Sequence, residues 1–253
     1  MSKLKPEQYL APRMLNFVFE AGRIALKFFD NSHPQLKPDR SIVTQADKEI
    51  SKLSGIHFKD LLQTSQHLII DEENSDVFDY LDQNVLEKSP YVWAIDPIDG
   101  TRVYANHMAH FGISIGLFKD LRPFMGAVYF PALEELFYCD GGQGYFVRHP
   151  FSAQETKTVL RPLDQTISAQ SIFMCDDSLS AAFDWDYKDC QIMVTGCASV
   201  DLCWPAIGRG CGTLFKSSLW DFAGSWPVAR SAGLELRHFP SGKVLEKINV
   251  RLF

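Results

Sequence analysis

Two aspartates stand three residues apart at the end of a strongly apolar run, in the segment 93–101 that reads WAIDPIDGT. A buried strand that ends in a carboxylate and is followed by a stiff proline turn can direct Asp96, Asp99 and the carbonyl of Ile98 at one point. Hard oxygen ligands of this kind suit Mg²⁺. The alternative is a tight turn with a helix cap, as in many Asp-Gly turns. The segment is therefore a candidate metal site.

The two residues that follow this acidic pair add a candidate anion site. Gly100 and Thr101 are predicted to open a short helix. Free backbone N–H groups at a helix N-terminus favour a phosphate group. A metal site and a phosphate site would then be neighbours.

Two other segments place carboxylates beside apolar residues. Asp71, Glu72 and Glu73 follow the apolar run 68–70, and Asp221 lies between Trp220 and Phe222 at the start of a predicted helix. Taken alone, the first segment fits a solvated loop and the second an N-terminal helix cap. Neither segment alone indicates a metal.

The order of these segments along the chain resembles the inositol monophosphatase family, a group of magnesium-dependent, lithium-sensitive phosphatases. That family has an acidic pair after a strand, then a W-x-I-D-P-[IL]-D-G-T segment, then a late W-D-x-A helix. Two more segments match it: IVTQAD at 42–47 resembles its [LI]-V-T-x-x-D segment, and GCA at 196–198 with DLC at 201–203 resembles its G-[ST]-A-A-x-[DN]-[LM]-C segment. The resemblance extends over nearly the whole chain.

The resemblance implies a role for each matching position. The ligands of two or three Mg²⁺ ions would be Glu72, Asp96, the carbonyl of Ile98, Asp99 and Asp221. Asp47 and Thr101, together with Glu72, would orient and deprotonate the attacking water. The residues that contact the substrate would be Gly100, Thr101, Gly196, Cys197 and Ala198. The metal ions would activate the water and neutralise charge on the phosphate and the leaving group.

Several positions depart from the family pattern. Asp71 stands where a glycine usually precedes the acidic pair, which leaves open whether Glu72 or Glu73 is the principal ligand. Residues 212–219 contain none of the acidic residues that inositol-preferring members place before the W-D step. The segment GTRVY at 100–104 resembles the histidinol-phosphate and phosphoadenosine-phosphate branches.

Three functional hypotheses follow. The first is a Mg²⁺-dependent phosphomonoesterase that acts on a small phosphate monoester, such as an inositol, sugar or amino-alcohol phosphate. The second is a histidinol-phosphate phosphatase or a 3′(2′),5′-bisphosphate nucleotidase. The third is a catalytically weak member that serves as a regulatory or binding partner. Retention of every metal-ligand position in the sequence argues against the third.

Composition limits the partners of the chain. It has 253 residues, 46% of them apolar, and a formal net charge of −6. That charge argues against nucleic acid and anionic membrane surfaces as partners, and no apolar run is long enough for a membrane span. The six cysteines form no CxxC pair, which fits a reducing cytoplasm. A homodimer is expected from the resemblance.

The elements that must position these residues are predicted from apolar periodicity. A helix is expected over 7–29, and Thr44 with Asp47 forms a capping box that opens a second helix ending near Leu62. Short apolar runs then predict a mainly antiparallel sheet, with strands at 67–70, 91–95, 113–118, 126–130, 135–138 and 145–147. Later strands are expected at 172–175, 192–195 and 234–237, and later helices at 200–207 and 220–232.

The fold class expected from the resemblance is α/β (α+β), a layered αβαβα sandwich. Residues 1–150 would form an N-terminal α+β half that carries most metal ligands. Residues 151–253 would form a C-terminal α/β half that supplies Asp221 and the substrate-side residues. The two halves would make one compact unit with the active site between them.

Overall fold

The N-terminal helices form as their capping and periodicity predict, with one difference at the end of the second. The computed structural model describes residues 7–38, 41–74, 81–180, 182–186 and 188–252. Helix α1 spans Glu7–Phe28, and α2 spans Gln45–His57 with the Thr44/Asp47 capping box in place. The predicted end near Leu62 is wrong, because the helix stops at Phe58 and a separate α3 covers Lys59–Leu62. Phe58 is fully buried and its ring packs against Trp93, and this packing is consistent with the end of α2 at this residue.

A seven-stranded sheet follows in the order β3-β4-β5-β6-β7-β8-β9. Only β3 and β4 are parallel, so the prediction of a mainly antiparallel sheet is confirmed. The strands are β3 His67–Asp71, β4 Tyr91–Asp99, β5 Gly112–Lys119, β6 Arg122–Phe130, β7 Glu135–Cys139, β8 Gly144–Arg148 and β9 Thr156–Val159. The short elements beside them are η1 Phe29–Asn31, β1 Gln35–Leu36, β2 Ile42–Val43, α4 Gln83–Lys88 and α5 Thr101–Ala105.

The C-terminal half has a smaller sheet in the order β11-β10-β12, with both pairings parallel. Its elements are β10 Ile172–Cys175, α6 Asp177–Ser180, β11 Gln191–Met193, α7 Ala198–Cys203, η3 Pro205–Ile207, β12 Gly212–Leu214, α8 Leu219–Ala223, α9 Ser225–Ser231 and η4 Val250–Leu252. The predicted strand at 234–237 is wrong: Arg237 makes only an isolated bridge to Val244. Leu245 donates to the carbonyl of Leu236 at 2.8 Å, so this segment folds back on itself and does not extend the sheet.

The predicted helix over 220–232 is divided into α8 and α9 at Gly224. Pro227 has no N–H to donate to the preceding turn, which favours a break there. The break also lets the backbone approach the large sheet closely, because a Cβ on Gly224 would lie 2.6 Å from the carbonyl oxygen of Ala127. A continuous helix with a side chain at this position would not fit.

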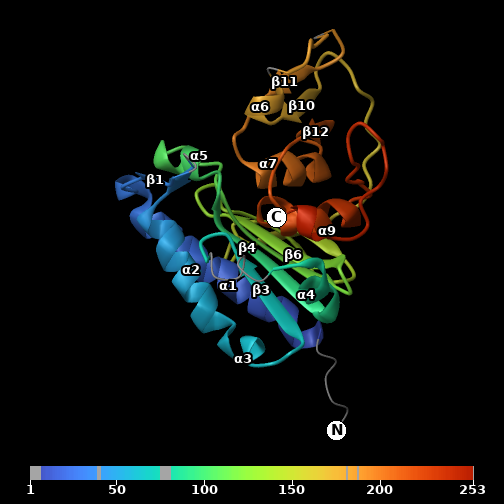
Figure 1. Ribbon diagram of the computed structural model, residues 1–253. Coiled ribbons are helices and arrows are strands. Elements are labelled where there is room, and N and C mark those ends of the chain that lie inside the picture. Colours follow the sequence, from blue (N-terminus) through green and yellow to red (C-terminus); the bar gives the residue numbers. More distant parts are fainter. Residues whose placement is uncertain (1–6, 39–40, 75–80, 181, 187, 253) are drawn as a thin grey trace.

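The layers of the fold are visible in Figure 1. Helices α1 and α2 cover one face of the large sheet, and α8 and α9 cover the other. Beyond α7 and α9 lies the small sheet, with α6 beside β10 and β11. The predicted layered α+β class is confirmed. The large sheet continues to Val159, past residue 150, and the division into two halves at that point stays a prediction. Among the described helices, none combines the length and apolar character needed to cross a membrane.

An ion pair joins the two halves. Arg209 donates from both terminal nitrogens to Glu135 of β7, at 2.7 and 2.5 Å, and its guanidinium lies 5.3 Å from the Trp204 ring. The Glu135 side chain is buried.

We expect Arg209→Gln to lower the free energy of unfolding by about 3 kcal/mol, because it leaves a buried carboxylate without its cation. Urea denaturation measures the change. The matched control is Arg122→Gln, whose pair with Glu246 is exposed on both sides and should cost less than about 1 kcal/mol. Equal losses in the two variants would contradict this account of Arg209.

Candidate metal and phosphate site

Parallel pairing of β3 with β4 brings the first two carboxylates together. Asp71 is paired with Ile95, so the next residues along each strand, Glu72 and Asp96, follow at the same edge of the sheet. The amide of Glu72 donates to the carbonyl of Ile95 at 3.1 Å. The apolar strands therefore place two acidic side chains side by side.

The third carboxylate comes from the C-terminal half. Asp221 is the third residue of α8 and closes a capping box with Ser218, whose amide donates to Oδ2 of Asp221 at 2.9 Å. One oxygen each from Glu72, Asp96 and Asp221 lies within 4.8 Å of the others. Residues separated by almost 150 positions thus meet in one acidic group, as predicted.

The chemistry of this group fits a cation. Oδ1 of Asp96 and Oδ1 of Asp47 are both buried and have no hydrogen-bond partner in the described part of the chain. Buried polar atoms normally have partners, and carboxylates crowded together need a compensating charge. The residues present therefore fit a hard divalent cation such as Mg²⁺.

The electrostatics agree with this. Burial raises the pKa of Asp96 well above its usual value, and the neighbouring Glu72, Asp99 and Asp221 raise it further. Burial likewise raises the pKa of Asp221 and of Glu72. Burial also raises the pKa of Asp47 to about 7, against hydrogen bonds from Thr44 that lower it. Without a cation, burial and mutual repulsion disfavour the charged forms of these carboxyls, and a bound cation would stabilise those forms.

Glu72 is in the acidic group, whereas Glu73 pairs with Lys37, and the choice of Glu72 as the principal ligand stays a prediction. Lys37 lies 2.5 Å from Oε1 of Glu73 and 3.4 Å from Oε1 of Glu72. Asp71 points elsewhere and accepts from the Ser54 hydroxyl at 2.6 Å. Lys37 could not be selected from sequence, because a lone lysine in a loop forms no pattern.

We expect Lys37→Gln to lower the free energy of unfolding of the metal-free protein by about 1–2 kcal/mol, because two largely buried glutamates lose their shared cation. Chemical denaturation in the presence of a chelator measures it. In the control Lys52→Gln, the pair with Glu49 is exposed and the loss should stay below about 0.5 kcal/mol. If Lys37→Gln lowers the free energy of unfolding no more than Lys52→Gln does, Lys37 does not compensate the charges of Glu72 and Glu73.

Asp99 takes a different position from the other predicted ligands. Its carboxylate accepts from the amides of Ala198, at 3.2 Å, and Ser199, at 2.5 Å, and from the Cys197 thiol at 3.1 Å. It therefore links β4 to the start of α7 and is not part of the group formed by Glu72, Asp96 and Asp221. Its role as a metal ligand stays a prediction.

The remaining predicted residues lie around this link. The Thr101 hydroxyl donates to the carbonyl of Ile98 at 2.9 Å, whereas Asp47 accepts from Thr44. Gly100 has a positive φ of 79°, and a Cβ there would lie 3.0 Å from Cβ of Cys197. Residues 100–101 thus adjoin residues 196–198, the two predicted substrate-binding segments. The predicted cooperation of Asp47 with Thr101 is untested by these contacts.

The sequence model of the inositol monophosphatase family matches residues 9–250. The chain belongs to the inositol monophosphatase family. Inositol monophosphatase 1 of Solanum lycopersicum is 27% identical over 219 residues, which are 84% of this chain and 76% of that protein. Nus factor SuhB of Escherichia coli K12 is 29% identical over 235 residues, 88% of this chain and 82% of that protein.

Solved structures of this family share the fold. One of them is an IMPase/NADP phosphatase complexed with NADP and Ca²⁺, which is similar to this chain with a TM-score of 0.76 and 17% sequence identity. The similarity covers 98% of this chain and 90% of the phosphatase chain. Inositol monophosphatase family members are metal-dependent phosphatases, and the acidic group of this chain fits that property.

Proposed function

We propose that this inositol monophosphatase family member is a Mg²⁺-dependent phosphomonoesterase that hydrolyses a small phosphate monoester with water. The observation that carries the proposal is the meeting of Glu72, Asp96 and Asp221, where the buried Oδ1 of Asp96 has no hydrogen-bond partner among the described residues. Two or three Mg²⁺ ions are expected. Ca²⁺ in the related IMPase/NADP phosphatase supports a divalent-cation site.

The roles of the protein's own groups follow from their positions. Glu72, Asp96 and Asp221 would hold the metal, with Asp99 and the carbonyl of Ile98 as further ligands. When bound, Mg²⁺ supplies charge neutralisation at the phosphate and a more acidic water. Asp47, whose buried Oδ1 has no partner among the described residues, would accept the proton of the attacking water together with Thr101 and Glu72.

The phosphate itself would be held by backbone groups. The amides of Gly100 and Thr101 open α5 and are suited to a phosphate oxygen. The leaving group would lie toward Gly196, Cys197 and Ala198, because the turn at Gly196 packs against Gly100. These assignments place phosphate and leaving group between the two halves of the molecule.

Three further properties belong to the same proposal. Lithium should inhibit the enzyme, as the family resemblance implies. The enzyme is expected to be a homodimer in the cytoplasm. Its partner would be a small phosphate monoester, and it would bind neither nucleic acid nor a membrane.

A panel of phosphomonoesters tests the function. Purified protein is assayed for inorganic phosphate release from inositol 1-phosphate, histidinol phosphate and adenosine 3′,5′-bisphosphate, with Mg²⁺ and with a chelator. We expect release from at least one ester in the presence of Mg²⁺ only. Release that persists in the chelator, or none from any ester, would refute the proposal.

A second candidate function is motivated by one relative. The similar protein of Escherichia coli is named a Nus factor, which favours a regulatory or binding role with weak catalysis. The same panel separates the two, because a regulatory member would bind Mg²⁺ without turning over any of the esters.

A further inference from the structure

A cavity lies among the C-terminal elements, and the acidic group does not line it. Its volume is about 620 Å³, and it is enclosed by the small sheet, α7, α8, α9 and the segment 234–245. Its lining includes none of Glu72, Asp96, Asp99, Asp221, Gly100 or Thr101. Small-molecule sites are typically cavities of roughly this size with mainly apolar walls and a few polar groups.

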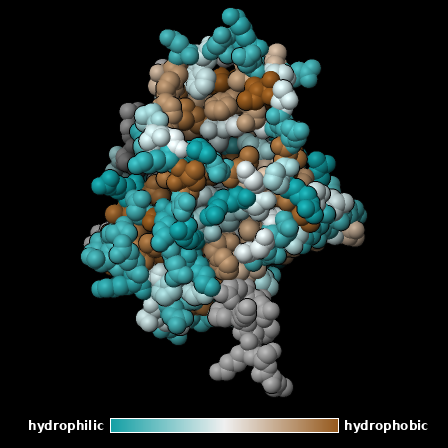
Figure 2. Space-filling view, turned by 90° about the vertical axis from the view of Figure 1, so that its right-hand side faces the viewer, coloured by the Kyte–Doolittle hydropathy of each residue, from teal (hydrophilic) through white to brown (hydrophobic). Residues whose placement is uncertain are grey.

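The walls of this cavity are rich in aromatic rings. Phe173, Phe215 and Phe222 line it from the sheet and helix sides. At its mouth, Phe183 and Phe239 meet edge to face with ring centroids 5.7 Å apart, and they remain 38% and 59% exposed. Figure 2 shows brown surface between teal groups over the upper part of the molecule, where this half lies. Exposed aromatic rings around an apolar hollow suit a flat apolar ligand.

Two polar atoms in the lining have incomplete hydrogen bonding. Asp201 of α7 is only 3% exposed. Its Oδ1 accepts a hydrogen bond from the Thr195 hydroxyl at 2.6 Å, and no described residue donates to its Oδ2. The hydroxyl oxygen of Thr213 in β12 is buried and has no partner in the described ranges. Buried carboxylates are normally paired with a cation.

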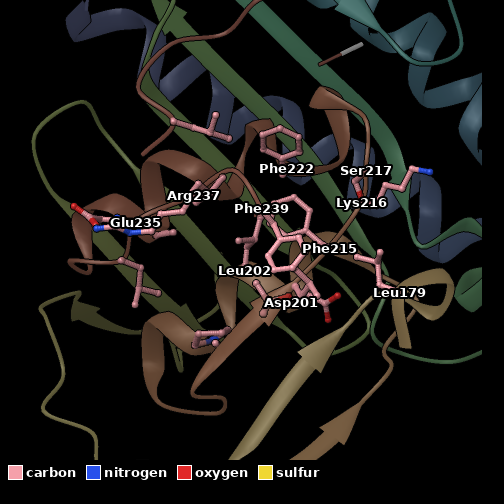
Figure 3. A pocket seen from close by; sticks show the side chains of 18 of the residues that line it. Leu179, Asp201, Leu202, Phe215, Lys216, Ser217, Phe222, Glu235, Arg237 and Phe239 are labelled. Atoms are coloured by element: carbon pink, nitrogen blue, oxygen red, sulfur yellow. The ribbon is translucent and has the colours of Figure 1, made fainter. Parts of the chain in front are cut away.

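The cations near this cavity do not compensate Asp201. Lys216 is exposed, and Figure 3 shows its ammonium group turned away from the Asp201 carboxylate. Arg237 instead pairs with Glu235 and donates to the carbonyl of Gly242. The buried Asp201 therefore lines an aromatic cavity and has no ion pair with a cation among the described residues.

We propose that this cavity binds a small aromatic amine, with its ring between Phe215 and Phe239 and its ammonium group on Asp201. The amine would donate to the second carboxylate oxygen of Asp201, and Thr213, whose buried hydroxyl has no partner among the described residues, lines the same cavity. A charged donor on a buried carboxylate gives a strong, specific hydrogen bond. The site is independent of the proposed hydrolysis, so neither result decides the other.

Two probes of nearly equal shape test the ammonium contact. Tryptamine and 3-(2-hydroxyethyl)indole differ only in that the first has an amine where the second has a hydroxyl. Each probe is titrated into the protein in a calorimeter, and excess Mg²⁺ is present so that the acidic group is occupied. We expect tryptamine to bind roughly tenfold or more tightly. Equal affinities for the two probes, or no binding of tryptamine at millimolar concentration, would overturn the proposal.

Two variants locate the site. Phe239→Ala removes a ring at the exposed mouth and should weaken tryptamine binding at least about fivefold. Phe151→Ala removes a partly exposed ring that packs on Phe19 and Tyr129, none of which lines the cavity; it is the matched control and should change nothing. Asp201→Asn should remove the preference for the amine; if that variant does not fold, the two probes on the wild-type protein still decide. Tryptamine binding that survives Phe239→Ala unchanged would place the ligand elsewhere and refute the assignment.

Discussion

Asp96→Asn is expected to lower the rate of Mg²⁺-dependent phosphate release by about 100-fold or more. Asp96 is 1% exposed and lies between Glu72 and Asp221, so the substitution removes both a charge and an oxygen ligand at the centre of the acidic group. A bound metal contributes several kcal/mol to the transition state, and each 1.36 kcal/mol corresponds to about tenfold in rate.

The control for this prediction is Asp164→Asn, which makes the same chemical change at an exposed position. Circular dichroism and thermal unfolding show whether each variant is folded. If a folded Asp96→Asn protein releases phosphate at the wild-type rate, Asp96 does not belong to the active site.

The metal-free protein is expected to become less stable as the pH rises from about 5.5 to 8. Burial raises the pKa of Asp47 from 3.8 to about 7, so the folded protein holds a proton there that the unfolded chain has already lost. Stability is therefore highest below the unfolded value and falls as the pH rises toward the folded one. This group alone accounts for a loss of about 2 kcal/mol between pH 5.5 and pH 7.

Burial also raises the pKa of Asp201 to about 7, and the raised pKa values of the neighbouring Glu72, Asp96 and Asp221 act in the same direction. Urea denaturation at a series of pH values, with a chelator, measures the loss. Adding Mg²⁺ at a hundred times its dissociation constant should restore about 2.7 kcal/mol. Stability that increases with pH in the chelator would contradict the burial of uncompensated carboxyls.

The elements built on strong local patterns were predictable. Six of the seven strands of the large sheet follow from short apolar runs between turns, and α2 begins at the Thr44/Asp47 capping box. The edge strand β9 was not predicted, because its residues Thr156–Val159 are exposed and form no apolar run. The boundary at Phe58 was not predictable, because it depends on the packing of that ring against Trp93. The segment 234–237 has the apolar pattern of a strand. Its backbone pairs with Val244 and Leu245 further along the chain, so it does not join the small sheet.

The candidate site was predictable in residue type more than in arrangement. Spacing alone indicated Asp96 and Asp99 as neighbours, but the structure turns Asp99 to the amides of Ala198 and Ser199. Those amides and Lys37 come from distant segments that only the tertiary fold brings together. Asp221 was selected through the family resemblance, and the capping box of α8 explains how it reaches the other carboxylates.

The most direct test of the central claim, that Glu72, Asp96 and Asp221 form a divalent-cation site, is crystallographic. Mn²⁺ takes the same oxygen ligands as Mg²⁺ and scatters anomalously. Crystals of the protein grown with Mn²⁺ should show an anomalous peak within coordination distance of an oxygen from each of the three carboxylates. A map with no peak at these carboxylates would contradict the claim.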